Sequence, residues 1–139
     1  MRLVVDASVA VKWVLRDQPN ETHVDRALAL LGAVSRQSAT AVEPVHWVAE
    51  VVGVVTRLKP DRAPATIALV THSRFATTAS RAVYRRAAEL SATLKHHLFD
   101  TLYHAVALEE GATLITADET YFNKAKSAGG IVQLADFSI

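Results

Sequence analysis

Residues 2–13 read RLVVDASVAVKW, an apolar run that stops at an acid and then continues in a helical pattern. The run at residues 3–5 is short, continuous and rich in β-branched side chains, which is typical of a buried strand in a parallel sheet. Asp6 follows this strand, and Ser8 is expected to cap a helix that continues to about Arg16. The stretch TLITAD at residues 113–118 repeats the arrangement with Asp118. Both acids therefore fall at carboxyl ends of strands, where open α/β sheets place their sites.

The rest of the chain alternates between short apolar runs and helical patterns, without a hairpin signal. We expect further strands at residues 41–42, 75–79 and 131–134. Helices are expected at residues 21–34, 44–58, 63–73, 81–92, 99–110 and 119–127, with Pro44 in a first turn and Ser80 as an N-cap. This order predicts an α/β fold, a three-layer sandwich around a central, mostly parallel sheet of four to five strands.

Length and composition limit the kind of protein. A chain of 139 residues, half of them hydrophobic and 21% charged, predicts one soluble globular domain over residues 1–139. The absence of cysteine excludes a disulfide framework and a thiolate zinc site. The apolar start is too short for a signal peptide, and no apolar run approaches the ~20 residues needed to cross a bilayer. We therefore expect a cytoplasmic protein that does not bind a membrane.

Charge is unevenly distributed although the chain carries only +1 overall. Residues 57–95 hold eight basic residues against two acids, a net +6, which leaves −5 for the remainder. A polyanion could dock on the basic segment, with Arg81 and Arg85, four apart on one helix face, as candidate phosphate contacts. Lys12 is a third candidate from the first helix. A pair of solvated helices is the alternative reading of the same charges.

Four acids lie among apolar residues, where ordinary surface charges are not expected: Asp6, Glu50, Asp100 and Asp118. Each aspartate alone could cap a helix, whereas Glu50 interrupts a helical run of valines. Together they would repel one another unless a cation joined them. Carboxylates from separate elements are the ligands that Mg²⁺ or Mn²⁺ prefers, and one or two such ions can activate water against a phosphodiester. The set therefore predicts a metal-dependent nuclease.

The same segments resemble a known family. Residues 4–13, 44–58, 99–107 and 114–119 are similar to those of PIN-domain ribonucleases, and among them to VapC-type toxins of toxin–antitoxin pairs. The resemblance implies a PIN-like fold and an Mg²⁺-dependent endoribonuclease, with Mn²⁺ as a substitute, that leaves 5′-phosphate and 3′-hydroxyl ends. It also implies an RNA substrate, a cognate antitoxin protein and a homodimer.

The resemblance also assigns roles to residues. Asp6, Asp100 and Asp118 would bind the metal directly or through water, and Glu50 would be a further ligand or a base that orients water. Thr116, and Ser8 in the same way, would hydrogen-bond a carboxylate or a metal-bound water.

Two other functions fit some of these residues. An aspartate-based phosphotransfer protein also places an acid after a strand, but a dehalogenase-type phosphatase needs a second acid where this chain has Ser8, and a receiver domain needs paired acids near its start. A non-catalytic nucleic-acid or protein-binding module with the PIN fold is the other alternative. His96 and His97 precede Asp100 and could touch substrate, but these two and His104 match no zinc motif and are expected to be solvated or packed.

Overall fold

The computed structural model describes all residues, 1–139. Its five strands are β1 (Arg2–Val5), β2 (Thr40–Pro44), β3 (Phe75–Thr78), β4 (Thr113–Thr116) and β5 (Ile131–Gln133). Its α-helices are α1 (Ala7–Val14), α2 (Val24–Ser35), α3 (Trp47–Leu58), α4 (Ala63–Val70), α5 (Arg81–Leu94), α6 (Leu98–Glu109) and α7 (Glu119–Ala125). Short 3₁₀ turns lie at Pro60–Arg62, Lys126–Ala128 and Leu134–Asp136.

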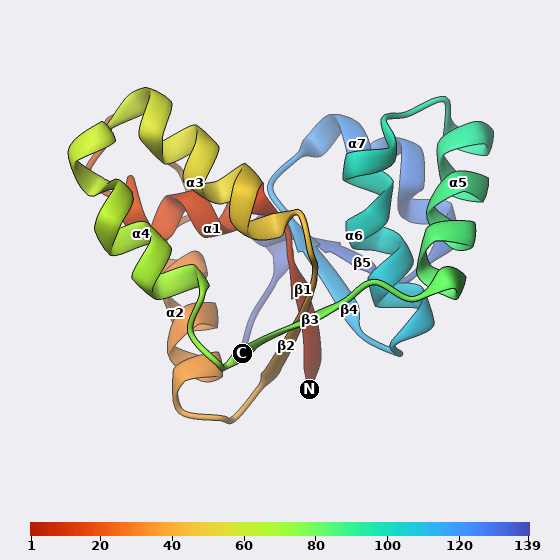
Figure 1. The fold of residues 1–139 in the computed structure, drawn as a ribbon, viewed down its shortest axis with the longest axis horizontal. Coiled ribbons are helices and arrows are strands. Elements are labelled where there is room, and N and C mark those ends of the chain that lie inside the picture. The colour runs from red at the N-terminus through yellow and green to blue at the C-terminus, as the bar shows by residue number, and fades with distance from the viewer.

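The strands form one sheet in the order β3-β2-β1-β4-β5, and every neighbouring pair is parallel. Helices α1 to α4 lie on one side of this sheet and α5 to α7 on the other (Figure 1). The predicted three-layer α/β fold is therefore confirmed, with a sheet that is wholly parallel. Because β1 lies at the centre and β4 is its neighbour, the residues that follow these two strands meet at one edge.

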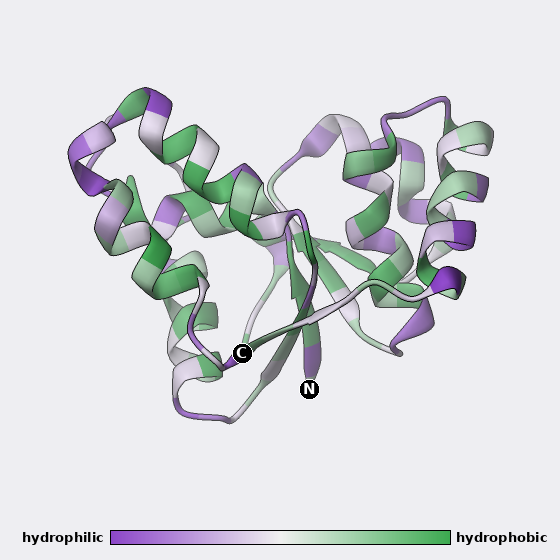
Figure 2. Cartoon of the chain, viewed as in Figure 1, coloured by the Kyte–Doolittle hydropathy of each residue, from purple (hydrophilic) through white to green (hydrophobic).

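The core explains why these segments fold as they do. Leu3, Val4 and Val5 have no exposed surface, as expected of a strand covered on both faces. Helix α6 packs against β1, β2 and β4, and its residues 101–107 are all buried. Figure 2 shows the strands and the inner sides of the helices as the hydrophobic part of the chain. None of the helices combines the length and the apolar character that crossing a membrane requires.

The starts of α3 and α1 differ from the predicted ones in ways that matter for the site. Pro44 was expected to begin a helix, but it ends β2 opposite Thr78, and α3 begins at Trp47. A proline is tolerated there because the end of a strand can do without its N–H. Helix α1 begins directly after Asp6, so Ser8 lies inside the first turn and does not cap the helix. The predicted cap at Ser80 is confirmed, since its side chain accepts a hydrogen bond from the Val83 amide.

Candidate metal centre

The four predicted acids come from four elements and line one cleft. Asp6 follows β1, Asp118 follows β4, Glu50 lies on α3 and Asp100 lies in the first turn of α6. Together they line a cleft of about 520 Å³ at the carboxyl edge of the sheet. The remaining wall consists of Ala7, Ser8, Val11, Ala49, Gly53, Val54 and Arg57. The parallel sheet thus gathers acids that are more than 100 positions apart in the chain.

Hydroxyl groups orient Asp6. Thr116 Oγ1 donates to Asp6 Oδ2 at 2.6 Å, and Ser8 Oγ donates to the same oxygen at 2.8 Å. The two hydroxyls are themselves fixed, because Thr116 Oγ1 accepts from the Asp118 amide at 3.0 Å and Ser8 Oγ accepts from the Ala117 amide at 3.0 Å. This network joins the ends of β1 and β4, and it directs both donors at one oxygen of Asp6.

Asp118 has two roles in the structure. Its Oδ1 accepts a hydrogen bond from the Tyr121 amide at 3.0 Å, so it caps α7 as the ordinary structural reading of this residue predicts. The same carboxylate also lines the cleft. One carboxylate can do both, because each of its two oxygens accepts independently.

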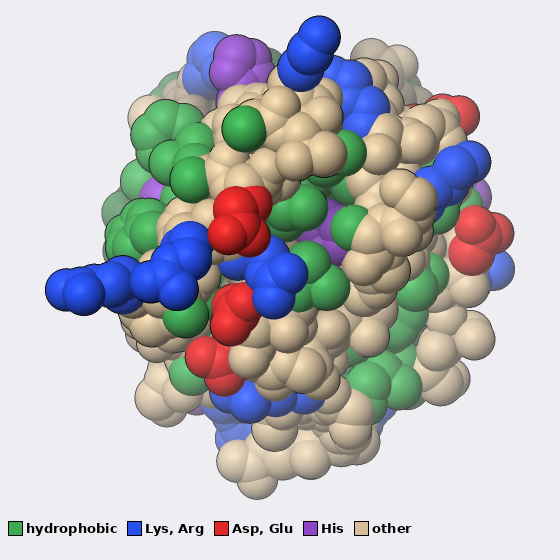
Figure 3. All heavy atoms as spheres, turned by 90° about the vertical axis from the view of Figure 1, so that its right-hand side faces the viewer, with side chains coloured by type: hydrophobic (Ala, Val, Ile, Leu, Met, Phe, Trp, Pro, Cys, Tyr) green, Lys and Arg blue, Asp and Glu red, His purple; other side chains and the backbone are tan.

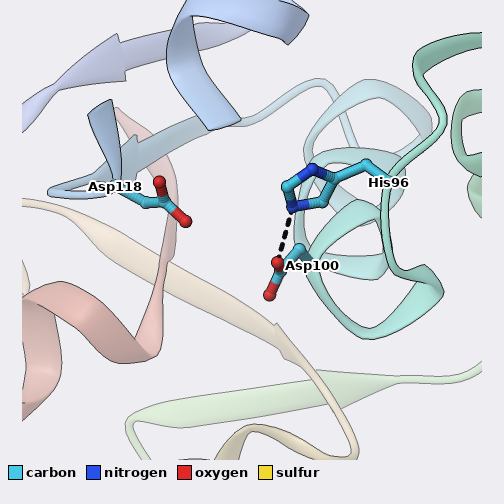
Figure 4. Close-up of side chains that lie close together, drawn as sticks. All are labelled: His96, Asp100 and Asp118. Carbon is cyan, nitrogen blue, oxygen red and sulfur yellow. Dashed lines mark hydrogen bonds and ion pairs between the residues drawn. The ribbon is translucent and has the colours of Figure 1, made fainter. Parts of the chain in front are cut away.

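Asp100 faces Asp118 and a histidine across the cleft. His96 Nε2 lies 2.7 Å from Asp100 Oδ2. One ligand atom each from His96, Asp100 and Asp118 can be chosen so that all lie within 4.8 Å of one another. Figure 4 shows the imidazole against the Asp100 carboxylate, with the Asp118 carboxylate pointing toward the same space. His96 is packed, as expected, with its ring against Tyr121, but its contact with Asp100 was not foreseen. His104 is packed, with hydrogen bonds to Tyr121 and to the Gly129 carbonyl.

Glu50 is held from α6 and from the turn before α3. The Tyr103 hydroxyl donates to Glu50 Oε2, and His46 Nε2 lies 3.8 Å from Glu50 Oε1. Burial and the neighbouring Glu50 charge raise the pKa of Tyr103, so this phenol keeps its proton and remains a donor. Glu50 therefore reaches the cleft in a fixed orientation.

The electrostatics of the cleft favour a cation. Burial raises the pKa of Asp6; the Thr116 and Ser8 hydroxyls counteract this, and repulsion from Asp100 and Asp118 adds to it. Burial also raises the pKa of Glu50, against the Tyr103 hydrogen bond and together with repulsion from Asp6 and Asp100. Carboxylates that repel one another inside a cleft, with an imidazole beside them, form a donor set that fits Mg²⁺ or Mn²⁺.

The predicted basic contacts lie elsewhere. Lys12 is buried and pairs with Glu21 at 2.9 Å, and it does not line the acidic cleft. Arg81 and Arg85 are exposed on α5, also outside the cleft lining. Figure 3 shows acidic and basic side chains interspersed over the face that lies on the right of Figure 1. Arg57 is instead the basic residue in the cleft wall. Its spacing from Glu50, seven residues along one helix face, is the signal that could have found it.

Glu43 is a second acid that sequence reasoning missed. Its side chain has no exposed surface, Oε1 accepts the Val5 amide at 2.8 Å, and Oε2 has no partner. Burial raises its pKa well above the ordinary value, and the nearby Asp6 charge adds to this. The signal in the sequence was an acid inside the strand TAVEP, between apolar neighbours.

Several solved structures share this fold over nearly their whole length. VapBC2 from Rickettsia felis, bound to a DNA fragment from its promoter, matches with a TM-score of 0.68 and 18% identity, covering 96% of this chain and 97% of that one. VapBC-1 from nontypeable Haemophilus influenzae matches with a TM-score of 0.68 and 15% identity, covering 98% and 100%. FitAcB from Neisseria gonorrhoeae matches with a TM-score of 0.63 and 19% identity, covering 97% and 99%.

Comparison with sequences points the same way. No curated protein matches this chain significantly. The family model described as the PIN domain matches residues 3–127, a span that includes all four acids of the cleft and their hydroxyl donors. The chain therefore belongs to the PIN-domain family.

Proposed function

We propose that this protein is a metal-dependent endoribonuclease and the toxin of a toxin–antitoxin pair. The observation that carries the proposal is the convergence of Asp6, Glu50, Asp100 and Asp118 on one cleft from four separate elements. Four acids in one cleft are costly without a cation, and PIN domains as a family are nucleases. The reaction is hydrolysis of an RNA phosphodiester: the bond from phosphorus to the 3′-oxygen breaks, a water oxygen joins phosphorus, and the 3′-oxygen takes up a proton.

The surroundings of each residue suggest its part in this reaction. Asp6, Asp100 and Asp118 would hold Mg²⁺ or Mn²⁺, and one or two such ions would lower the pKa of a bound water and offset charge on the phosphate. Thr116 and Ser8 keep Asp6 in one orientation by donating to its Oδ2. Glu50, held by the Tyr103 hydroxyl, would accept a proton from the attacking water. Arg57 offers the cleft wall a positive charge for a phosphate oxygen.

The partners follow from resemblance. The similar structures are of VapBC and FitAB proteins, and the resemblance of the sequence is to the toxin of such pairs. We therefore propose a small antitoxin protein as the partner, and by the same resemblance a homodimer that acts in the cytoplasm. Arg81 and Arg85, exposed on α5, are proposed as contacts for RNA beyond the cleft.

Cleavage of labelled RNA by the purified chain tests the activity. We expect cleavage with Mg²⁺ or Mn²⁺ that leaves 5′-phosphate ends and stops in EDTA. Asp100→Asn should abolish it while circular dichroism shows a retained fold. Asp25→Asn, an exposed acid on α2, is the matched control and should cut like the unaltered protein. Equal cleavage with and without EDTA, or by Asp100→Asn, would overturn the proposal. Single-stranded DNA of the same sequence, tested in parallel, shows whether RNA is preferred.

A further inference from the structure

The imidazole of His96 lies beside the cleft, against the Asp100 carboxylate. Its side chain is 10% exposed, and its ring lies against Tyr121 with centroids 4.8 Å apart. The backbone is fixed as well: the His96 amide donates to the Ser91 carbonyl, and the Ser91 hydroxyl donates back to the His96 carbonyl. Lys95 ends α5 in the left-handed conformation, with φ of 52°, which turns the chain toward the cleft. His96 is therefore held in place before any ligand arrives.

The position of its ring nitrogen suits a metal ligand. Nε2 lies 2.7 Å from Asp100 Oδ2, and it belongs to a set with Asp100 and Asp118 whose ligand atoms lie within 4.8 Å of one another. Donors that share one ion at ~2.0–2.2 Å lie about 3–4.5 Å apart, so these atoms need to move little to share one. The three side chains come from a loop, from α6 and from the end of β4, and Figure 4 shows them around a common space.

We propose that His96 is a nitrogen ligand of the divalent ion in this cleft, and that it makes the site select Mn²⁺ over Mg²⁺. This inference rests on the proposed function, because it concerns the same ion. Mg²⁺ is a hard cation that takes oxygen ligands and keeps its waters, whereas imidazole binds first-row transition metals more readily. A site of carboxylates alone would not show this preference as strongly.

Lys124 contacts the other ring nitrogen of His96 and would compete with the ion for the ring. Its ammonium lies 3.2 Å from His96 Nδ1, and because an ammonium can only donate, Nδ1 accepts and Nε2 carries the ring hydrogen that faces Asp100. Ligation through Nε2 needs that hydrogen on Nδ1, so Lys124 must turn away, which its exposed position on α7 permits. Lys124 therefore fixes the ring and also competes with the ion. Lys124→Met should bind Mn²⁺ more tightly, and Lys126→Met, a nearby exposed lysine, should change the affinity less.

Spin-echo spectra of Mn²⁺ bound to the full chain test the ligand directly. We expect modulation from a coordinated ¹⁴N nucleus that disappears in His96→Ala and persists in His97→Ala, the exposed neighbour. In titrations, His96→Ala should lose about 10-fold or more in Mn²⁺ affinity and less in Mg²⁺ affinity. His96→Gln, which offers an oxygen donor, should regain part of the Mg²⁺ affinity without the nitrogen signal.

The outcomes separate this inference from the proposed function. Bound Mn²⁺ without ¹⁴N modulation in the unaltered protein, or with modulation that persists in His96→Ala, overturns the role of His96 and leaves the nuclease proposal intact. If His96→Ala fails to fold, the spectrum of the unaltered protein and the His96→Gln variant still decide. If Mn²⁺ does not bind the unaltered protein, the role of His96 fails; if Mg²⁺ does not bind either, both proposals fail.

Discussion

The central strand β1 and its neighbour β2 end at the same edge of the sheet, and each brings a carboxyl group there. Asp6 follows β1, and Glu43 is the next-to-last residue of β2. Burial raises the pKa of both groups. They differ in their partners: Asp6 accepts two hydroxyl hydrogen bonds and lines the cleft, whereas Glu43 accepts one backbone amide and leaves its other oxygen unpaired.

The difference shows what makes a buried acid a ligand. Two donors on one oxygen favour the ionised form of Asp6, and the cleft gives a cation access to it. Glu43 has neither access to the cleft nor enough donors, so burial raises its pKa well above the ordinary value, and ionising it in the folded protein costs stability. Acidity at the edge of the sheet is therefore not sufficient for a site; the proposed metal ligand is the acid that is hydrogen-bonded by hydroxyls and lines the cleft.

Neutralising the two acids in turn tests their difference, and the largest effect is expected at Asp6. Asp6→Asn should lower cleavage by more than about 100-fold, beyond the 10–100-fold typical of outer partners of a metal site, because it removes a ligand charge. The same change should raise the free energy of unfolding, since it removes a buried group that resists ionisation. Urea titrations and cleavage rates on the same samples measure both. Reduced stability together with retained cleavage would contradict the proposed role of Asp6 as a ligand.

Removing one donor to Asp6 is the next largest test. Thr116→Val deletes the hydroxyl that donates to Asp6 Oδ2 and accepts from the Asp118 amide, at nearly the same side-chain volume. We expect a loss of about 10–100-fold in metal affinity and in cleavage. Thr113→Val, at the start of the same strand, is the control and should leave both unchanged. Isothermal titration with Mn²⁺ gives the affinity, and equal values for the two variants would show that the hydroxyl does not matter.

Glu43→Gln tests the other half of the comparison. The amide oxygen can still accept the Val5 N–H, and no proton must be taken up on folding. We expect the free energy of unfolding at neutral pH to rise by about 1–3 kcal/mol, because each unit by which burial raises the pKa of Glu43 costs about 1.4 kcal/mol, less the cost of the amide group left unpaired at the place of Oε2. Cleavage should stay within about twofold, because Glu43 does not line the cleft. A loss of cleavage as large as that of Asp6→Asn would mean that Glu43 takes part in the site.

The same contrast explains which residues of the site could be predicted from the sequence. Asp6 and Asp118 follow apolar runs with strand character, so a local pattern locates them, and parallel topology then brings them together. Glu50 and Asp100 were identified because an acid in an apolar helix needs a reason. These features, with the order of elements, predicted the fold and the four acids that line the cleft.

The residues whose positions were missed or predicted differently depend on long-range geometry. His96 meets Asp100 only because Lys95 turns the chain at the end of α5. A histidine in a polar stretch of sequence gives no indication of such a contact. Lys12 was a predicted phosphate contact, but in the fold it pairs with Glu21, in the loop between α1 and α2, at 2.9 Å. Pro44 fits a first helical turn as well as a strand end, and sheet pairing with Thr78 decided between them.

The pH dependence of stability gives the smallest expected effect and separates Glu43 from other titrating groups. A carboxyl with a raised folded-state pKa binds its proton more tightly in the folded protein, so its contribution is full below the ordinary value of 4.5 and is lost as pH rises toward the raised pKa. His46 and His104 act with the opposite sign below 6.5, because burial lowers their pKa. Asp17, whose pKa Arg62 lowers, acts only below 3.8.

The difference between Glu43→Gln and the unaltered protein cancels those other groups. We expect this difference in unfolding free energy to grow as pH rises above 4.5, by at most about 1.4 kcal/mol per pH unit for one proton, and to level off once Glu43 ionises in the folded state. Urea titrations at several pH values between 4.5 and 8 measure it. A difference that stays constant with pH would mean that Glu43 keeps its ordinary pKa inside the fold. Burial would then not oppose the ionisation of Glu43 as it opposes that of Asp6, and only access to the cleft would account for their different roles.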